Sequence, residues 1–346
     1  FQTSVKAIAR AGAGVNNIPI KKCTEQGIVV FNTPGANANA VKELVIASLL
    51  LSSRKIYQGV AWSQSLKGKG DEVPKLVEKG KSNFVGPEIY GKTLGVIGLG
   101  AIGMLVANAA ESLGMRVIGY DPFISIDVAW QLSKNVEKAR SLDSLLAESD
   151  YITVHVPLLD STKNLLNRSK LTIMKDGVRI LNFAREGLVD KTDVLNAINE
   201  GKVACFVTDF PEDDLLGNDR VITVPHLGAS TPESETNCAM MAVDQLKNFL
   251  ENGNIRNSVN FPTADMPRNG GTRLIIANRN VPAMVGKITS VLAEQDLNIA
   301  DMLNQHREDL AYNIIDIDGI VKEDQIAKIR KIDGIILARV LEPAGR

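Results

Sequence analysis

The chain has 346 residues, and its 39 Lys and Arg against 40 Asp and Glu give a formal net charge of −1. A chain of this length predicts two or three domains, and the balanced charge excludes the basic footprint expected of a partner for nucleic acid or an anionic membrane. No apolar run reaches the length of a bilayer span. Three widely spaced cysteines without metal-ligand spacing, Cys23, Cys205 and Cys238, suit a reducing cytoplasm. We therefore expect a cytoplasmic globular protein that binds no metal.

The first part of the chain alternates strands with glycine-containing loops. Residues 5–9 read as a strand at the very start of the sequence, so we expect the natural amino terminus to be missing. The elements that follow are a loop at 10–17, a short helix at 20–26, a strand at 28–31, a turn at 32–35 and a long apolar helix from Val41 to about Ser53. Small residues in the two loops leave backbone N–H groups free to face a ligand.

The stretch from Gly91 to Asp121 reads as strand, glycine turn, helix and strand. Its first strand ends directly in the sequence GLGAIG at 98–103, which opens a helix to about Leu113. A second strand, at 116–120, stops at Asp121. This complete context is typical of a dinucleotide-binding fingerprint.

Each glycine of the fingerprint has a physical role. Gly98 permits a tight turn, Gly100 lets a pyrophosphate approach the backbone, and Gly103 lets helix and strand pack closely. The helix amino terminus offers free N–H groups to the phosphates. Asp121 lies eighteen residues past Gly103, where an acid can bind the ribose hydroxyls, and no Arg follows it. These features favour NAD over NADP.

Residues 122–231 continue the strand and helix alternation that predicts a parallel sheet. We expect helices at 126–132, 142–147 and 191–199, and strands at 151–155, 178–182, 203–207 and 221–224. Polar residues follow these strands, at the edge where open α/β sheets bind their ligands. The predicted fold class is therefore α/β, with a Rossmann-type doubly wound parallel sheet.

The last part of the chain predicts a separate small domain. An amphipathic helix at 232–250 leads into a stretch rich in Asn, Pro and Gly. A βαββαβ unit follows, with strands at 274–277, 299–306, 312–317 and 335–340 and helices at 282–295 and 322–330. The predicted domains are a discontinuous substrate-binding domain (1–46 plus 232–256), an NAD-binding domain (47–231), a linker (257–272) and a terminal domain (273–346).

Three candidates for catalysis stand at strand carboxyl ends: Arg185, an acid near Asp213, and His226. Oxidation of a secondary alcohol needs a base for the hydroxyl proton, and imidazole suits that role at neutral pH. A carboxylate can fix the imidazole tautomer, and an Arg can hold a substrate carboxylate. Of the three histidines, His155 lies on an apolar strand and His306 in the terminal domain, which favours His226. A structural capping histidine is the alternative for His226 taken alone.

Five motifs in this order resemble the D-2-hydroxyacid dehydrogenase family: GLGAIG with Asp121, HVPL at 155–158, NFAREGLVD at 182–190, TDFP at 208–211 and PHLGAST at 225–231. RAGAGVNN at 10–17, FNTPGANANAVKEL at 31–44 and the terminal domain are similar to family members that act in L-serine biosynthesis. The resemblance implies NAD-dependent oxidation of a phosphorylated 2-hydroxy acid, D-3-phosphoglycerate, to 3-phosphohydroxypyruvate. It also implies a flavodoxin-like substrate domain, incomplete at its amino terminus, and a homodimer or homotetramer.

The resemblance further implies roles for individual residues. Arg185 would bind the substrate and act in catalysis, and His226 would be the general acid/base with an acid beside it. The implied NAD contacts are Gly98, Gly100, Ala101, Ile102, Gly103, Asp121, His155, Val156, Pro157, Ala184, Arg185, Asp209, His226, Leu227, Gly228 and Thr33. The implied substrate contacts are Arg185, the backbone N–H groups of Ala13, Gly14 and Val15, and Asn16 beside them.

The chain departs from the family pattern after the strand at 203–207. Asp213 stands where the family has its catalytic Glu, and because Asp is one methylene shorter, Glu212 or Asp214 can serve instead. Thr208, not Asp209, occupies the family's nicotinamide-amide position, but we favour Asp209 for its chemistry. The residues that hold the substrate phosphate are expected to be among those missing upstream.

The terminal domain resembles an ACT domain, a small-molecule-sensing fold. The resemblance implies L-serine as an effector held by Asn278, Asn280 and Asn298, although Ala283 replaces a usual Gly and can crowd the site. A purely structural pairing module is the alternative. For the whole chain the alternatives are a dehydrogenase acting on glyoxylate, hydroxypyruvate or another small 2-hydroxy acid, and a catalytically inactive sensor of NAD and amino acids.

Overall fold

The structure, a computed structural model, describes residues 4–343. The chain divides into two compact units, one formed by Phe1–Ala36 with Glu235–Arg346 and the other by Asn37–Ser234. The outermost residues of the predicted terminal segments, 1–3 and 344–346, lie outside the described residues. Among the residues described, none of the helices is long and apolar enough to cross a membrane.

The Asn37–Ser234 unit is built on a seven-stranded, fully parallel sheet with the order β5-β4-β3-β6-β7-β8-β9. The strands are β3 (Thr93–Ile97), β4 (Arg116–Tyr120), β5 (Glu137–Lys138), β6 (Tyr151–Val154), β7 (Val178–Asn182), β8 (Val203–Thr208) and β9 (Val221–Thr223). The strand order reverses between β3 and β6, which is the position where open α/β sheets form a ligand crevice. This confirms the predicted α/β fold with a Rossmann-type sheet.

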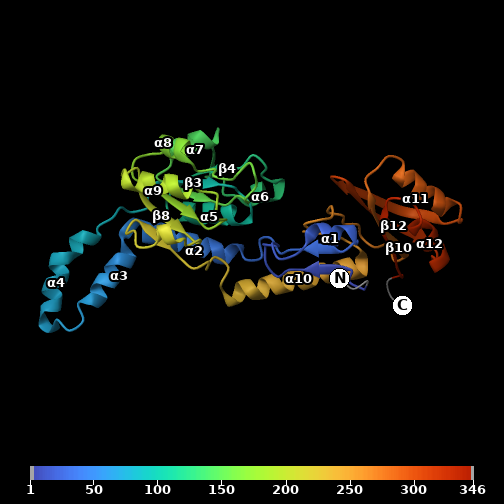
Figure 1. Cartoon of the computed structure of the whole chain (residues 1–346), viewed down its shortest axis with the longest axis horizontal. Coiled ribbons are helices and arrows are strands. Elements are labelled where there is room, and N and C mark those ends of the chain that lie inside the picture. Colours follow the sequence, from blue (N-terminus) through green and yellow to red (C-terminus); the bar gives the residue numbers. More distant parts are fainter. Residues whose placement is uncertain (1–3, 344–346) are drawn as a thin grey trace. The chain divides into compact units, whose positions relative to one another are not determined.

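Helices cover both faces of this sheet (Figure 1). On one face lie α7 (Leu142–Glu148), α8 (Arg168–Ile173) and α9 (Lys191–Asn199), and on the other lie α2 (Ala38–Arg54) and α5 (Ala101–Ser112), with α6 (Ile126–Gln131) beside α5. The first face buries Leu145, Leu171 and Ile198 against the strands. The second face buries Val45 and Val106. The sheet is therefore doubly wound, as predicted.

The helix α2 shows why the predicted domain boundary at residue 46 differs from the observed one. It begins at Ala38, and Val41, Val45 and Leu49 all enter the core beneath the sheet. Residues one turn apart share one helix face, so these positions bury together beneath the sheet. Residues 37–46 therefore pack with the sheet unit.

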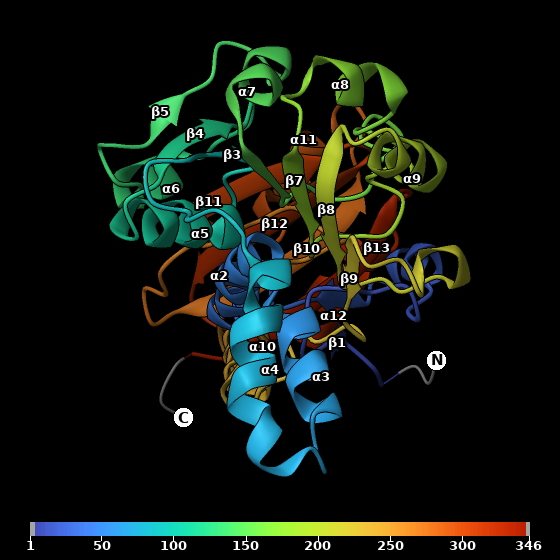
Figure 2. The same ribbon diagram turned by 90° about the vertical axis from the view of Figure 1, so that its left-hand side faces the viewer.

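A helical arm follows α2 and was not predicted. It consists of α3 (Ile56–Ser65), η1 (Gly70–Glu72), α4 (Val73–Gly80) and η2 (Lys81–Phe84). Figures 1 and 2 show α3 and α4 as a pair that extends away from the sheet. Trp62 and Phe84 pack with ring centroids 5.3 Å apart, but neither helix contains a buried residue. The arm therefore has no core built from its own helices.

The other unit contains a two-stranded parallel sheet, β1 (Ala7–Ala9) with β2 (Val29–Phe31), and the short helix α1 (Ile20–Glu25). The long helix α10 (Pro232–Asn252) enters this unit at Glu235. Asn260 fixes β2, because its side chain accepts a hydrogen bond from Val30 N and donates one to Ile28 O, both at 2.9 Å. These elements are what the described chain contains of the predicted flavodoxin-like domain.

The terminal domain has the predicted βαββαβ order: β10 (Thr272–Arg279), α11 (Met284–Ala293), β11 (Asn298–Arg307), β12 (Leu310–Asp318), α12 (Glu323–Arg330) and β13 (Ile335–Leu341). Its antiparallel sheet has the order β11-β12-β10-β13. The helices α11 and α12 cover the face that carries Leu274 and Ile276. The opposite face, with Ile275 and Tyr312, packs in one core with Phe249.

The predicted linker, 257–272, is largely part of this second core. Phe261, Ala264 and Met266 are buried, and Ala264 forms an antiparallel bridge with Ile255. Its Asn, Pro and Gly content suggested an exposed connection, but the apolar residues between them fill the core. The segment thus packs as a structural layer beneath the terminal sheet.

Two buried side chains of the terminal sheet hold the carboxyl end of α10. Arg273, fully buried, forms an ion pair with Asp316 through Nε at 2.6 Å and donates through Nη1 to the carbonyl of Asn252 at 2.9 Å. The Tyr312 hydroxyl donates to the carbonyl of Gly253 at 2.7 Å. A helix end exposes carbonyls without helical partners, so these donors satisfy acceptors that would otherwise be buried unpaired.

Candidate active site

The glycine turn after β3 shows three different reasons for glycine. Gly98 has φ +90°, and a Cβ there would lie 2.8 Å from the carbonyl group of His155. A Cβ on Gly103 would lie 1.9 Å from the carbonyl oxygen of Gly98. A Cβ on Gly100 would meet no protein atom within 4 Å. The space beside Gly100 is therefore free for a ligand to approach the backbone, as a dinucleotide cradle requires.

The amino end of α5 points donors toward the same space. The first helical hydrogen bond joins Met104 N to Gly100 O at 3.0 Å. The N–H groups of the first turn, at Ala101, Ile102 and Gly103, therefore have no acceptor within the helix. Free N–H groups at a helix amino terminus bind phosphate well.

Asp121, at the end of β4, is tied to the glycine turn. Its Oδ2 accepts a hydrogen bond from Leu99 N at 2.8 Å, and its Oδ1 accepts one from Phe123 N at 2.8 Å. Each carboxylate oxygen has further lone pairs, so the group can still accept bonds from ribose hydroxyls. The pyrophosphate cradle and the predicted ribose ligand are thus held as one local structure.

Replacing Gly103 by Ala should affect stability, whereas replacing Gly100 by Ala should affect NAD binding. We expect Gly103→Ala to destabilise the unit by about 1–3 kcal/mol because the new methyl overlaps the Gly98 carbonyl. We expect Gly100→Ala to leave the melting temperature close to that of the natural protein but to weaken NAD binding, because only a ligand meets the new methyl. Thermal unfolding without NAD, together with calorimetric titration of NAD, checks both variants; a large loss of stability in Gly100→Ala would contradict the assignment.

His155 follows β6 and lies against the glycine turn. Its backbone N–H donates to Ile97 O at 2.7 Å, and its Nε2 lies 2.9 Å from Thr153 Oγ1. Burial lowers the pKa of His155 to about 3. The ring therefore stays neutral at physiological pH and is poorly suited to act as the acid/base of the reaction. Val156 lies close to the same turn, because a Cβ placed on Gly98 would be 2.8 Å from Val156 Cγ1. Pro157 is the next residue.

The loop after β7 presents Arg185. Asn182, which is buried, accepts a hydrogen bond from Ala184 N at 3.2 Å and donates one to Arg185 O at 2.9 Å. The Arg185 side chain is exposed, and its Nη1 donates to Ala184 O at 2.6 Å. Asn182 is thus a supporting residue whose role the sequence analysis missed; its polarity at the end of an apolar strand was the available signal.

The loop after β9 presents His226 beside the end of β8. His226 is exposed and has φ +55°, and its ring lies 5.3 Å from that of Phe210 in an edge-to-face arrangement. Asp209 is only 1% exposed; its Oδ1 accepts from Leu227 N at 2.6 Å and its Oδ2 from Gly228 N at 2.9 Å. Burial raises the pKa of Asp209, and these N–H bonds oppose the rise.

The three acids considered as partners of His226 differ in their surroundings. Glu212 and Asp214 both bind Lys191, at 2.6 and 3.0 Å. Asp213 is exposed and begins η3 (Asp213–Leu215). Within residues 4–343, no hydrogen bond joins any of the three to the His226 ring. The identity of the partner acid stays a prediction.

The predicted substrate loop lies in the other unit. Thr33 is fully buried and accepts a hydrogen bond from Gly12 N at 2.7 Å, which fixes the start of this loop. The backbone N–H groups of Ala13, Gly14 and Val15 donate to no acceptor among the described residues. Asn16 beside them is exposed. Such a row of free N–H groups can bind an anion such as a carboxylate.

The three asparagines predicted to hold an effector do not all lie close together within a single copy of the chain. Asn278 is buried and its Oδ1 accepts from Asn313 Nδ2 at 2.8 Å, while Asn280 lies just past the end of β10. Asn298 pairs with Asp318 at the opposite end of the sheet. Ala283, where the related domains usually have Gly, adopts φ +64°. That backbone conformation is the one that glycine accommodates without strain.

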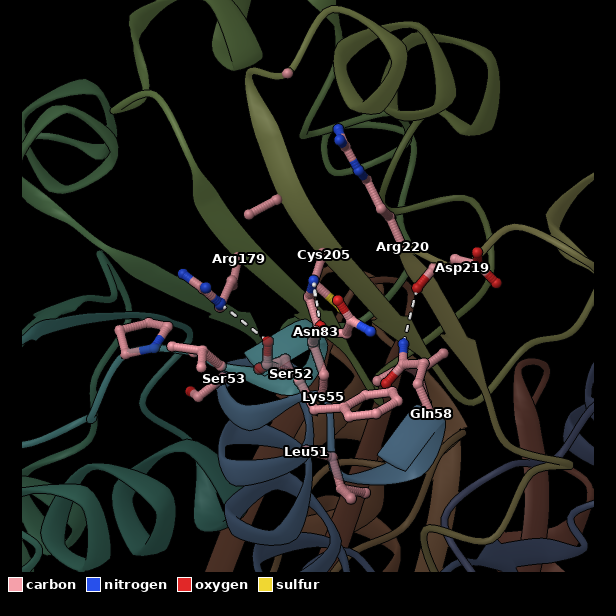
Figure 3. A pocket seen from close by; sticks show the side chains of 17 residues that line it. Leu51, Ser52, Ser53, Lys55, Gln58, Asn83, Arg179, Cys205, Asp219 and Arg220 are labelled. Atoms are coloured by element: carbon pink, nitrogen blue, oxygen red, sulfur yellow. Dashed lines mark hydrogen bonds between the residues drawn. The ribbon is translucent and has the colours of Figure 1, made fainter. Parts of the chain in front are cut away.

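A separate cavity of about 730 Å³ lies at the carboxyl end of α2 (Figure 3). Figure 3 shows Arg179 bonded to Ser52 and Gln58 bonded to Asp219, with Cys205 nearby. Arg179 is near the amino end of β7, whereas Arg185 follows its carboxyl end. Burial raises the pKa of Cys205 to about 11, so its thiol stays protonated. None of the predicted site residues lines this cavity.

Comparison with known proteins identifies the class. Residues 46–228 match the family described as D-isomer specific 2-hydroxyacid dehydrogenase, NAD binding domain. This match covers more than half of the chain, and the sheet order and glycine cradle fit it. The chain belongs to the D-isomer specific 2-hydroxyacid dehydrogenase family, whose cofactor is NAD.

The chain is similar to D-3-phosphoglycerate dehydrogenases of two organisms. The chain is 40% identical over 270 residues to a D-3-phosphoglycerate dehydrogenase of Archaeoglobus fulgidus, covering 76% of this chain and 48% of that protein. It is 33% identical over 346 residues to that of Haemophilus influenzae, covering 95% of this chain and 79% of that protein. Thus the chain spans only about half the length of the Archaeoglobus protein.

A solved structure supports the same family. The glyoxylate reductase from Paecilomyes thermophila superposes with a TM-score of 0.62 at 30% identity, over 74% of this chain and 76% of that chain. Glyoxylate, the acid that this reductase is named for, differs from the phosphoglycerate named in the other relatives. The fold is therefore shared by proteins that are named for different substrates.

Proposed function

We propose that the protein oxidises D-3-phosphoglycerate to 3-phosphohydroxypyruvate with NAD, the entry reaction of L-serine biosynthesis. The observation that carries this proposal is that Arg185 follows β7 and His226 follows β9, the two strands that flank β8, at the same edge of the parallel sheet as the glycine cradle that fits NAD. The similarity to D-3-phosphoglycerate dehydrogenases of two organisms supports the choice of substrate.

Different residues of the chain have different roles in this reaction. The glycine cradle with the amino end of α5 would hold the pyrophosphate of NAD, and Asp121 its adenosine ribose. When bound, NAD supplies the acceptor for a hydride. A ring nitrogen of His226 accepts the proton of the substrate's C2 hydroxyl. Arg185 binds the substrate carboxylate and stabilises the carbonyl oxygen as it forms.

The free N–H groups at Ala13, Gly14 and Val15, with Asn16 beside them, can bind a carboxylate. For the partner acid of His226 we keep Asp213, since Glu212 and Asp214 are both engaged by Lys191. Among the variants Asp213→Asn, Glu212→Gln and Asp214→Asn, the first should lower kcat the most.

Substrate profiling on the natural full-length protein tests the reaction. D-3-phosphoglycerate should reduce NAD with a kcat/KM well above that for D-glycerate or glycolate. The similarity to glyoxylate reductase favours one second candidate, a reductase for glyoxylate or hydroxypyruvate. A preference for these unphosphorylated acids would support it, and NAD binding without turnover on any of them would indicate the inactive sensor.

The cofactor assignment gives a prediction at Asp121. We expect Asp121→Ala to weaken NAD binding by about 10²–10⁴-fold, because two ribose hydrogen bonds to a charged group are lost, at about 1.5–3 kcal/mol each. The variant also releases Leu99 N and Phe123 N, so melting temperatures must be measured in parallel. Calorimetry with ADP-ribose should show the same loss as NAD, and an unchanged affinity for both would contradict the ribose contact.

For the terminal domain we propose binding of L-serine, supported by the βαββαβ order and by Asn278 and Asn280 at one sheet end. Because Asn298 lies at the other end, the proposal requires either fewer ligating residues or a second copy. Calorimetric titration of the whole protein with L-serine, with D-serine as control, tests it. Equal heats for both would favour the structural role.

We also propose a cytoplasmic homodimer or homotetramer. The arm formed by α3 and α4 supports self-association, because Ile56, Tyr57 and Val60 are 43%, 63% and 56% exposed. Apolar side chains clustered on a projecting element are typical of a contact surface. Three free, buried cysteines are compatible with the cytoplasm. Light scattering should give at least a dimer mass, and Val60→Asp should lower it.

A further inference from the structure

A second cavity lies along α10, and none of the predicted site residues lines it. Its volume is about 580 Å³, which is within the usual range for small-molecule sites. The lining comes from one face of α10, from Gly35 and Ala36 after β2, and from the loop that begins at Asn254. All of these residues belong to the unit of Phe1–Ala36 and Glu235–Arg346. The glycine cradle for NAD belongs to the other unit, so this cavity is a separate feature of the fold.

Gln245 is the side chain of this cavity that asks for a ligand. It is only 8% exposed, and within residues 4–343 neither its buried Oε1 nor its buried Nε2 has a hydrogen-bond partner. Exchanging the two atoms by turning the amide leaves both unpaired. A buried polar group without a partner costs stability, and native folds keep few of them. A ligand in the cavity can supply the two missing bonds.

The neighbours of Gln245 narrow the chemistry of that ligand. Asn248, one helical turn further along α10, also lines the cavity, and its Oδ1 accepts a hydrogen bond from Asn254 Nδ2 at 3.3 Å. Its own Nδ2 keeps donors for a ligand. Met240 and Met241 add two thioethers, which pack favourably against aromatic rings. This combination suits a flat heterocycle whose rim carries a hydrogen-bond donor next to an acceptor.

We propose that this cavity binds the adenine base of a nucleoside. A glutamine amide pairs with adenine through two bonds, because its Oε1 accepts from N6 and its Nε2 donates to N7. These are the two bonds that Gln245 lacks. Asp244 also lines the cavity, and Arg256 there is already bonded to Asp265 at 2.9 Å. A phosphate would therefore meet a carboxylate and an engaged guanidinium, which favours adenosine over AMP.

Three nucleosides test the proposal on the natural whole protein. Calorimetric titrations are made with NAD at saturation, so that the cofactor cradle is filled before the nucleoside is added. Adenosine should bind about tenfold or more tightly than purine riboside, which lacks the 6-amino group, and than 7-deazaadenosine, which lacks N7, because each analogue leaves one buried group unpaired. AMP should bind more weakly than adenosine. No binding of adenosine, or equal affinity for the three nucleosides, would overturn the proposal.

Gln245→Met separates a ligand contact from a structural role. The variant keeps the volume of the side chain but has no amide, so its affinity for adenosine should fall about tenfold or more while its affinity for NAD stays the same. The melting temperature of the ligand-free variant should rise, because no unpaired amide is then buried. A structural role for Gln245 predicts a lower melting temperature with natural affinity for adenosine, and that result would contradict the proposal.

The matched control is Gln58→Met. Gln58 also has a buried Oε1 without a partner among the described residues, but its Nε2 donates to Asp219 O at 2.9 Å and it lines the cavity at the end of α2. This variant should bind adenosine as the natural protein does. Adenosine should also raise the melting temperature of the natural protein and of this control, but not that of Gln245→Met. Equal shifts in all three proteins would place the nucleoside elsewhere and overturn the proposal. If Gln245→Met does not fold, the ranking of the three nucleosides on the natural protein decides.

Discussion

Replacement of His226 by Ala should lower kcat by about 10²–10⁴-fold, the usual contribution of a positioned general base. The affinity for NAD should change less than about twofold, because the pyrophosphate and ribose ligands lie on β3, α5 and β4 rather than on the His226 loop. Single-turnover measurement of NADH formation, with calorimetry for NAD, gives both quantities. Without the imidazole, water must accept the proton of the substrate hydroxyl. Water is a much weaker base and is placed less favourably.

The matched controls are the other two histidines. His306→Ala lies in the terminal domain and should leave kcat unchanged. His155 remains neutral at physiological pH because burial lowers its pKa to about 3, so its replacement should affect cofactor affinity more than proton transfer. Parallel losses of kcat and NAD affinity in His226→Ala would show that the residue supports structure instead of the chemical step.

Replacement of Arg185 by Gln should lower kcat/KM by about 10²–10⁴-fold. Two hydrogen bonds between charged groups are worth about 3–6 kcal/mol, and each 1.36 kcal/mol corresponds to a tenfold change in rate. Arg185→Lys should recover only part of this loss, because an ammonium cannot form the two parallel bonds of a guanidinium. Steady-state kinetics of the three proteins, with melting temperatures, provides the measurement.

Arg179→Gln is the matched control for Arg185. Arg179 lies on the same strand but near its amino end, where it bonds to Ser52 O at 3.1 Å. This variant should lower stability more than activity. If Arg185→Lys keeps the natural kcat/KM, the residue contributes only charge, and the proposed carboxylate contact is wrong.

Much of the sheet unit could be predicted because its local signals and its packing agree. The glycine turn, the helix after it and Asp121 form a continuous stretch whose spacing is set by one structural unit. The strands from β6 to β9 are short apolar runs, and each is followed by polar residues. Arg185 and His226 lie in the loops that follow β7 and β9. Sequence order and spatial order coincide there.

Other features depend on contacts that spacing does not encode. The helices α3 and α4 contain no buried residue, so packing into a core does not define the arm. The predicted linker looked polar, but Phe261 and Met266 are needed by a core formed from distant segments. Asp209 is expected to contact the cofactor, and its further bonds to Leu227 and Gly228 depend on how β8 meets a loop about eighteen residues further on. The separation of Asn298 from Asn278 likewise follows from strand direction in the antiparallel sheet.

The most direct test of the account is hydride transfer from a labelled substrate. D-3-phosphoglycerate carrying deuterium at C2 is mixed with NAD and the natural full-length protein, and the NADH formed is examined by mass spectrometry. We expect one deuterium in the nicotinamide of each NADH, with 3-phosphohydroxypyruvate formed in equal amount. NADH without deuterium, or no NADH from this substrate under conditions where NAD binds, would contradict it.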